Sequence, residues 1–313
     1  MFPCWRSELR QLGGEDRREE TLDPRAPSAG LPVFPGSRYD GPVTITTWTD
    51  GERVIRIVRP ADPDRLLDDP QVQEWNRRDD YMPYWAYLWP GACLLAGEVA
   101  RAPWRELLVH HRQLLIHHRL RTADFEVLEI GCGVGLAGLV ALSRGLSVCF
   151  TDYDSAALEF VARSAAENGF DSSRFATRLL DWRDPPDERY PVILGSDLLY
   201  ERRLVPLLAK LLHRMLAPGG LGLIACPGRS SAEGFADSLA DHGLTCTATL
   251  GAAPSDEGKL VRGILYQISW SDEPASPFRE TASTLSTKRL GQPTSSTDAT
   301  PLSPQELGWK LDV

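Results

Sequence analysis

Two hydrophobic periods alternate along the central part of the chain. Short apolar runs bounded by glycine or proline predict strands, and longer segments with apolar residues three or four positions apart predict helices. Strands are expected at 125–130, 146–151, 175–180, 191–196, 221–226, 244–250 and 261–270. Helices are expected at 135–144, 154–168, 201–216 and 230–242. Strands that alternate with helices are typical of a parallel, doubly wound α/β sheet.

The last two expected strands break this alternation. A loop rich in Gly, Pro, Ser and acidic residues joins them at 251–260, and no helical pattern lies between them. A direct connection of this kind is typical of an antiparallel pair of strands. We therefore predict an α/β, Rossmann-like fold with a seven-stranded, mostly parallel sheet whose last strand is antiparallel.

A β-hairpin is expected before the sheet, because residues 43–58 alternate in polarity on both sides of an Asp-Gly turn. Short helices are expected at 64–67 and from Ala92 to Ala100. Between them, the segment 81–89 holds five aromatic residues in nine positions. Such a cluster fits a core plug beneath the hairpin and the wall of a binding site equally well.

Composition changes along the chain and predicts four parts. Residues 1–40 are rich in Arg, Glu, Pro and Gly, and we expect a disordered leader or sequence upstream of the true start codon. Residues 41–122 hold the hairpin, the aromatic segment and helices, and 123–270 form the core. Residues 271–313 are rich in Ser, Thr and Pro and are expected to be a disordered tail.

The net charge and the spacing of the cysteines exclude some classes of protein. The formal charge of −9 over 313 residues does not favour a broad surface for nucleic acid. Six cysteines lie far apart without a C-x-x-C pair, which is typical of reduced thiols in a cytosolic protein. No apolar stretch is long enough to span a membrane, and the N-terminus lacks a signal-peptide core. We expect a cytoplasmic protein with no nucleic-acid or membrane partner.

A basic segment at 101–121 contains two histidine pairs, at 110–111 and 117–118. Adjacent residues on a helix do not face each other, and no carboxylate lies among the four histidines to complete a metal site. We expect a solvated helix face there and no metal.

The stretch 125–138 reads F-E-V-L-E-I-G-C-G-V-G-L-A-G and predicts a strand, a glycine turn and a helix. This arrangement brings backbone N–H groups and a helix N-terminus close to a ligand. The next expected strand ends at Asp152, where a carboxylate would bind the hydroxyls of a ribose. Residues 133–138 satisfy the dinucleotide pattern G-x-G-x-x-G. The earlier frame, E-x-G-x-G-x-G from Glu129, resembles motif I of S-adenosylmethionine-dependent methyltransferases of the seven-strand class. The expected antiparallel last strand favours S-adenosylmethionine over a dinucleotide.

Two further segments follow expected strands. Leu180-Asp181-Trp182 ends the third strand, and Gly195-Ser-Asp-Leu-Leu-Tyr200 ends the fourth. Ligands of doubly wound sheets bind outside the carboxyl ends of the strands, so these residues are expected near the cofactor. A plain strand-end turn at Asp181 and a helix cap at Asp197 remain alternatives.

Together, the motifs resemble the lysine methyltransferase family of the seven-strand class. The family has a D-x-x-Y element after strand four and a W-P-G segment before motif I, and it includes the enzyme that methylates lysines of the electron-transfer flavoprotein beta subunit. The matching segments here are Y-W-A-Y-L-W-P-G-A, V-L-E-I-G-C-G-V-G, T-D-Y-D, L-D-W and S-D-L-L-Y-E. A later C-P-G-R at 226–229 is similar to the D-P-G-R of that enzyme, with Cys in place of Asp.

The resemblance implies S-adenosyl-L-methionine as the cofactor and a lysine-bearing protein as the substrate. It places Asp197 and Tyr200 on the acceptor side as catalytic residues. It implies a cofactor site formed by Trp89, Glu129, Gly131, Gly133, Gly135, Asp152, Tyr153, Asp181, Trp182 and Ser196.

Acceptor chemistry is consistent with this assignment. A lysine ammonium has no lone pair and must lose a proton before it can accept a methyl group, and an apolar slot lowers its pKa. Five aromatic residues are candidates for the walls of such a slot: Tyr84, Trp85, Tyr87, Trp89 and Tyr200. Asp197 could hold the incoming ammonium. A small-amine N-methyltransferase, a nicotinamide-dependent oxidoreductase and a catalytically silent binding scaffold remain alternatives.

Overall fold

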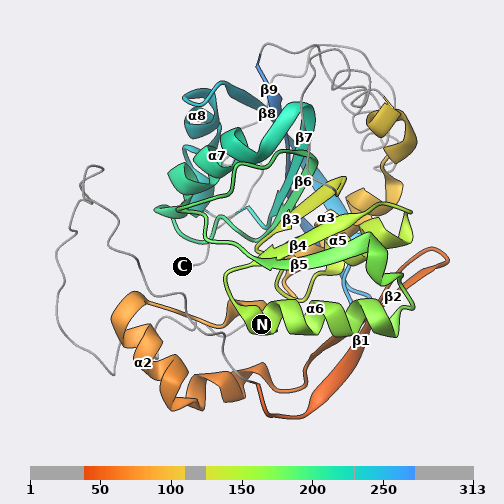
Figure 1. Ribbon diagram of the computed structural model, residues 1–313, viewed down its shortest axis with the longest axis vertical. Coiled ribbons are helices and arrows are strands. Elements are labelled where there is room, and N and C mark those ends of the chain that lie inside the picture. Colours follow the sequence, from red (N-terminus) through yellow and green to blue (C-terminus); the bar gives the residue numbers. More distant parts are fainter. Residues whose placement is uncertain (1–38, 110–124, 229, 272–313) are drawn as a thin grey trace. The chain divides into compact units, whose positions relative to one another are not determined.

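The computed structural model describes residues 39–109, 125–228 and 230–271 (Figure 1). The two histidine pairs, Arg229 and nearly all of the expected leader and tail lie outside the described residues.

A seven-stranded sheet forms the centre of the described chain, in the order β5-β4-β3-β6-β7-β9-β8. Its strands are β3 (Val127–Ile130), β4 (Val148–Asp152), β5 (Phe175–Leu179), β6 (Tyr190–Ser196), β7 (Leu216–Cys226), β8 (Leu244–Pro254) and β9 (Leu260–Trp270). Strand β9 runs antiparallel to both of its neighbours, β7 and β8, whereas β3 to β7 pair in parallel. The predicted fold class is therefore confirmed.

The connection between β8 and β9 is tighter than the sequence suggested. Half of the expected ten-residue loop is strand, and the chain reverses over residues 255–259, where the Ser255 amide donates to the Lys259 carbonyl at 2.7 Å. Its polar residues fit an edge hairpin because β8 is the last strand of the sheet and has one side exposed.

Helices cover both faces of the sheet (Figure 1). One face packs against α3 (Pro90–Arg101), α5 (Leu136–Ser143) and α6 (Ser155–Glu167), and the other against α7 (Leu204–Met215) and α8 (Phe235–Ala240). Helix α8 is shorter than the expected 230–242. A 3-10 turn, η4 (Ser230–Ala232), precedes it, and Gly234 with φ 78° separates the two. A left-handed residue interrupts the helical hydrogen-bond ladder, which explains the shortening.

The predicted hairpin is confirmed as β1 (Val43–Asp50) and β2 (Arg53–Pro60). It is anchored to α6, since the Val58 amide donates to Ser164 Oγ at 2.9 Å and the Arg56 amide donates to Asn168 Oδ1 at 2.9 Å. The buried Trp48 of β1 donates from Nε1 to the Pro254 carbonyl of β8 at 2.9 Å. The hairpin therefore shares one hydrophobic core with the sheet.

Sequence analysis missed one helix in the polar segment after the hairpin. The expected short helix is the 3-10 helix η1 (Pro63–Asp68), and α2 (Pro70–Asp79) follows it. Asp69 caps α2 by accepting a hydrogen bond from the Gln71 amide at 2.7 Å. An Asp-Pro pair is a helix-start signal, but among residues 70–78 of α2 only Val72 and Trp75 are buried, which left little apolar periodicity.

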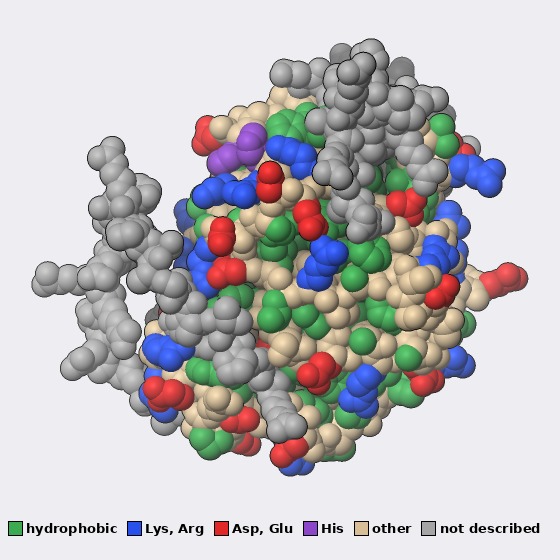
Figure 2. Space-filling model, in the orientation of Figure 1, with side chains coloured by type: hydrophobic (Ala, Val, Ile, Leu, Met, Phe, Trp, Pro, Cys, Tyr) green, Lys and Arg blue, Asp and Glu red, His purple; other side chains and the backbone are tan. Residues whose placement is uncertain are grey.

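Two properties of the described residues concern membranes and surface charge. None of the helices there combines the length and apolar character that crossing a membrane requires. On the face shown in Figure 2, basic and acidic side chains are interspersed.

Candidate functional site

Four neighbouring parallel strands end at one edge of the sheet, and each is followed by a candidate residue. Asp181 follows β5, Asp152 ends β4, Gly131 follows β3 and Asp197 follows β6. Because β5, β4, β3 and β6 are adjacent, the fold gathers these residues along the edge where doubly wound proteins bind ligands.

The glycine turn lies at the centre of this edge. Gly131, Gly133 and Gly135 all have positive φ angles, of 56°, 52° and 77°, which residues with a Cβ rarely adopt. A Cβ at Gly131 would lie 2.7 Å from the Leu198 side chain and 3.4 Å from the Trp182 ring. A Cβ at Gly133 would lie 3.3 Å from the Trp85 carbonyl oxygen. The turn is thus in direct contact with the segments after β5 and β6 and with the aromatic segment.

Asp152 connects the end of β4 to this turn. Its Oδ2 accepts from the Gly133 amide at 2.8 Å, and its Oδ1 accepts from the Asp154 amide at 3.0 Å. Desolvation of this enclosed carboxyl group raises its pKa to about 6, although these backbone hydrogen bonds favour the charged form. Each carboxylate oxygen retains a further lone pair. Asp152 can therefore accept two hydroxyl groups, as a ribose diol requires.

Glu129 takes a more internal position than Asp152. Its side chain is 2% exposed, and Oε2 accepts from the Gly138 amide of α5 at 3.0 Å. Burial raises the pKa of Glu129 to about 8, with a smaller contribution from the charge of Asp152. Glu129 thus fixes the glycine turn to the start of α5, and its contact with the methionine end of a cofactor stays a prediction.

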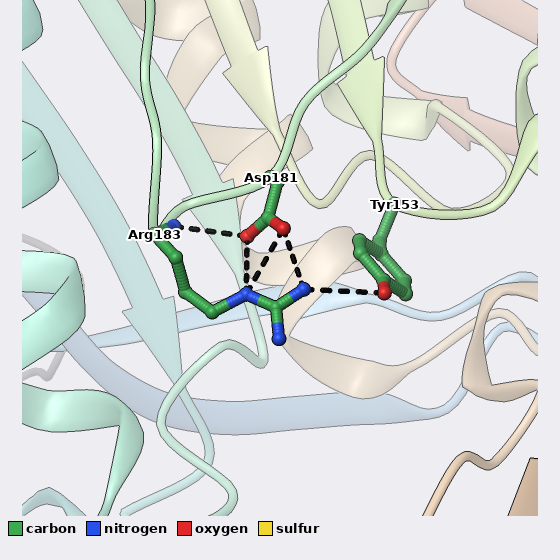
Figure 3. Close-up of polar contacts among 3 residues, drawn as sticks. All are labelled: Tyr153, Asp181 and Arg183. Atoms are coloured by element: carbon green, nitrogen blue, oxygen red, sulfur yellow. Dashed lines mark hydrogen bonds and ion pairs between the residues drawn. The ribbon is translucent and has the colours of Figure 1, made fainter. Parts of the chain in front are cut away.

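Asp181 forms a compact group with Arg183 and Tyr153 (Figure 3). Its carboxylate accepts from the Arg183 amide at 2.9 Å, from Nε at 2.8 and 2.9 Å, and from Nη2 at 2.5 Å. The Tyr153 hydroxyl lies 3.3 Å from Arg183 Nη2. Partial burial opposes ionisation, but the hydrogen bonds from Arg183 outweigh it and lower the pKa of Asp181. Sequence analysis did not single out Arg183, although its place two residues after Asp181 was visible.

Asp197 lies against the first turn of α3. Its side chain is 8% exposed, and its backbone has the unusual φ of 56° while its amide donates to the Ala225 carbonyl at 2.9 Å. A Cβ at Gly91 would overlap the Asp197 carboxylate. The carboxylate thus lies at a helix N-terminus, a position that favours negatively charged side chains. The W-P-G segment and the D-x-x-Y element are therefore one structural unit.

The aromatic rings at this edge divide into two sets. Tyr84 contacts Tyr200 and Trp89, with ring centroids 5.2 and 5.9 Å apart, and Trp89 Nε1 donates to the Tyr84 carbonyl at 2.8 Å. Trp85 instead packs on Phe160 of α6 at 5.4 Å and is 5% exposed. The expectation that Trp85 lines an acceptor slot is thus wrong, because its ring is part of the core.

The remaining candidates lie close to this wall. Tyr87 contacts Trp89 at 5.7 Å, and its hydroxyl donates to Asp64 at 2.6 Å. Burial raises the pKa of Tyr200 above its usual value, and the charge of Asp152 acts in the same direction. Tyr200 therefore keeps its proton at neutral pH. Ser196 ends β6 as a partly buried residue next to Asp197.

Comparison with known proteins assigns this site to a class. Residues 86–239 match the family described as lysine methyltransferase, a segment that contains W-P-G, the glycine turn and D-x-x-Y. The fold and site thus define an S-adenosylmethionine-dependent methyltransferase domain. This family match confirms the resemblance inferred from the motifs.

Curated relatives show similarity over parts of their chains. A protein N-lysine methyltransferase METTL21A of Xenopus tropicalis is 38% identical over 92 residues, which cover 28% of this chain and 42% of the relative. The electron transfer flavoprotein beta subunit lysine methyltransferase of Xenopus laevis is 28% identical over 172 residues, 53% and 62% of the two chains. A histone-arginine methyltransferase METTL23 of Xenopus laevis is 34% identical over 164 residues, 48% and 58%. The chain spans about half the length of the curated relatives that it matches.

Proposed function

We propose that this protein transfers a methyl group from S-adenosylmethionine to the ε-amine of a lysine in a protein substrate. One observation carries the proposal: the Asp197 carboxylate lies against Gly91 while the Tyr84 ring contacts Tyr200. The two motifs of the lysine methyltransferase family thereby form a single wall beside the glycine turn. The names of two matched relatives, both protein-lysine methyltransferases, support the same acceptor.

The residues of the site fit the cofactor. Asp152 has free lone pairs for the ribose hydroxyls, Asp181 supplies an acceptor for the adenine amino group, and Trp182 lies beside Gly131 where the base would pass. We place the methionine end at the glycine turn, with Glu129 behind it and Trp89 in front. Tyr153 and Ser196 complete the cofactor-binding set. When bound, the cofactor supplies a methyl group activated on a sulfonium.

The wall formed by Tyr84, Trp89 and Tyr200 would act on the acceptor. Aromatic faces attract the lysine ammonium, and the ionised Asp197 holds its charge at the entrance. Desolvation between the rings then disfavours the ammonium, which loses its proton to solvent. The neutral amine would then present its lone pair to the methyl group that the bound cofactor supplies. Positioning is thus most of the catalysis.

Incorporation of a labelled methyl group tests this proposal. The purified protein is incubated with tritiated S-adenosylmethionine and an extract in which methylation sites are unmodified, and the macromolecular and small-molecule fractions are counted. We expect label in a discrete protein band and methyllysine after hydrolysis. Label confined to small molecules would assign the enzyme to metabolite N-methylation. Recovery of methylhistidine or methylarginine after hydrolysis would show that histidine or arginine is the acceptor and not lysine.

An Asp197→Asn variant provides the matched control, since it keeps the shape of the side chain and removes its charge. Label that persists at the wild-type rate in this variant would show that the charge of Asp197 is not required for methyl transfer. Absence of label together with absence of S-adenosylmethionine binding would support a binding scaffold that has lost catalysis.

A further inference from the structure

Arg183 occupies the position at which an adenine amino group would be received. Its guanidinium bridges the Asp181 carboxylate and the Tyr153 hydroxyl, and its Cζ lies 5.7 Å from the centre of the Tyr153 ring (Figure 3). Asp181 and Tyr153 are both members of the proposed cofactor site. The bridge therefore spans the adenine end of that site.

Arg183 also donates to both carboxylate oxygens of Asp181 and occupies their hydrogen-bonding positions. A carboxylate offers about four lone-pair directions. Oδ1 accepts from the Arg183 amide and Nε, and Oδ2 accepts from Nε and Nη2, all at 2.5–2.9 Å. An adenine amino group can donate to this carboxylate only after part of the guanidinium contact has been released.

We propose that Arg183 competes with the adenine ring for the Asp181 carboxylate and thereby determines the affinity of the cofactor site. The inference rests on the proposed function, because it requires an adenine-bearing cofactor. Arg183 is a specificity-determining residue in this scheme: a base without a donor at the same edge gains nothing from displacing it, whereas adenine replaces one donor by another.

The solvent exposure of the Arg183–Asp181 ion pair determines how much Arg183 should weaken cofactor binding. The side chains of Arg183 and Asp181 are 41% and 37% exposed, and solvent-exposed ion pairs contribute little. Removing the competitor should therefore tighten cofactor binding by about two- to fivefold. The direction is diagnostic, because a residue that clamps the bound adenine would weaken binding when it is lost.

Titration calorimetry with S-adenosylhomocysteine on the full chain tests the proposal. Arg183→Met keeps the apolar stem of the side chain and removes its donors, and we expect the dissociation constant to fall. Arg178→Met is the matched control, since Arg178 forms a similarly exposed ion pair with a different carboxylate, that of Glu188, at 43% and 40% exposure. Its dissociation constant should equal that of the wild type.

A double-mutant cycle with Asp181→Asn separates competition from a structural role. The gain from Arg183→Met should disappear in the Asp181→Asn background, because no ionised carboxylate remains to compete for. An unchanged or weaker affinity in Arg183→Met, or a gain that persists without the Asp181 charge, would overturn the inference. No binding to the folded wild-type protein would instead refute the proposed function.

Discussion

Gly91 and Asp197 are in direct contact, although 105 residues lie between them in the sequence. A Cβ at position 91 would lie 2.8 Å from Asp197 Cγ and closer still to Oδ2. The glycine of W-P-G therefore leaves room for the carboxylate of D-x-x-Y. The backbone of Asp197, with φ 56°, aims this carboxylate at the first turn of α3.

Gly91→Ala should displace Asp197 without disturbing the cofactor side of the site. We expect turnover to fall by about tenfold to a hundredfold, because small displacements of catalytic groups have effects of this size. The affinity for S-adenosylhomocysteine should change little. Ala92→Gly is the control, since it perturbs the same helical turn without adding a group near Asp197. A Gly91→Ala enzyme with normal turnover would show that this contact has no catalytic role.

Asp197→Ala and Tyr200→Ala should each reduce turnover more than cofactor binding. Both residues lie on the proposed acceptor wall, where Asp197 holds the ammonium and Tyr200 contacts Tyr84. Methyl transfer and calorimetry on the same preparations measure the two effects. Tyr87→Phe removes the hydrogen bond to Asp64 but keeps the ring that contacts Trp89, and it should behave as wild type. Equal losses of turnover and binding in the alanine variants would place these residues on the cofactor instead.

Tyr84 and Trp85 are neighbours in sequence and should respond differently to mutation. Trp85 is buried against Phe160, so Trp85→Ala should lower the free energy of unfolding by about 3–5 kcal/mol. Tyr84→Ala should mainly reduce turnover, because its ring forms the wall with Tyr200 and Trp89. Thermal unfolding and methyl-transfer assays distinguish the two. Trp85→Phe retains part of the packing and should recover part of the lost stability.

Cofactor affinity should fall as the pH is lowered through about 6. Burial raises the pKa of Asp152 to about 6, so this carboxylate becomes protonated below that pH and accepts ribose hydroxyls less well. If only the ionised form binds, affinity for S-adenosylhomocysteine should be about tenfold weaker at pH 5 than at pH 7.5. Calorimetry at these two pH values checks this. An Asp152→Asn variant with the same pH dependence would assign the transition to another group.

Glu129 should make the protein less stable as the pH rises from its unfolded pKa towards about 8. Its pKa is raised in the folded state, so the native protein binds more protons than the unfolded chain in that range, and unfolding becomes easier as those protons are lost. Glu129→Gln can still accept from the Gly138 amide and carries no ionisable group. We expect it to gain roughly 3 kcal/mol relative to wild type between pH 5 and pH 8. Denaturant unfolding at both pH values measures this difference, and parallel pH profiles would contradict it.

Sequence periodicity alone predicted most of the fold. The alternation of strands and helices, the Asp-Gly hairpin and the missing helix before the last strand are local patterns, and the sheet with an antiparallel β9 agrees with them. The positive φ angles at Gly131, Gly133 and Gly135 agree with the spacing of the motif. Backbone geometry is limited chiefly by residue type and by neighbours along the chain, so it can be inferred from sequence.

Side-chain partners depended on tertiary structure. Sequence could not distinguish Tyr84, on the wall, from Trp85, in the core, because the 3-10 turn η2 (Tyr84–Ala86) has no extended apolar period. It could not show that Arg183 binds the carboxylate proposed for adenine, or that Gly91 makes room for Asp197. The sequence by itself determined the order of elements and the residue types available at the edge of the sheet. Only the packing of distant segments decided which of these residues meet, because contacts between them arise from the order of the strands and leave no local pattern.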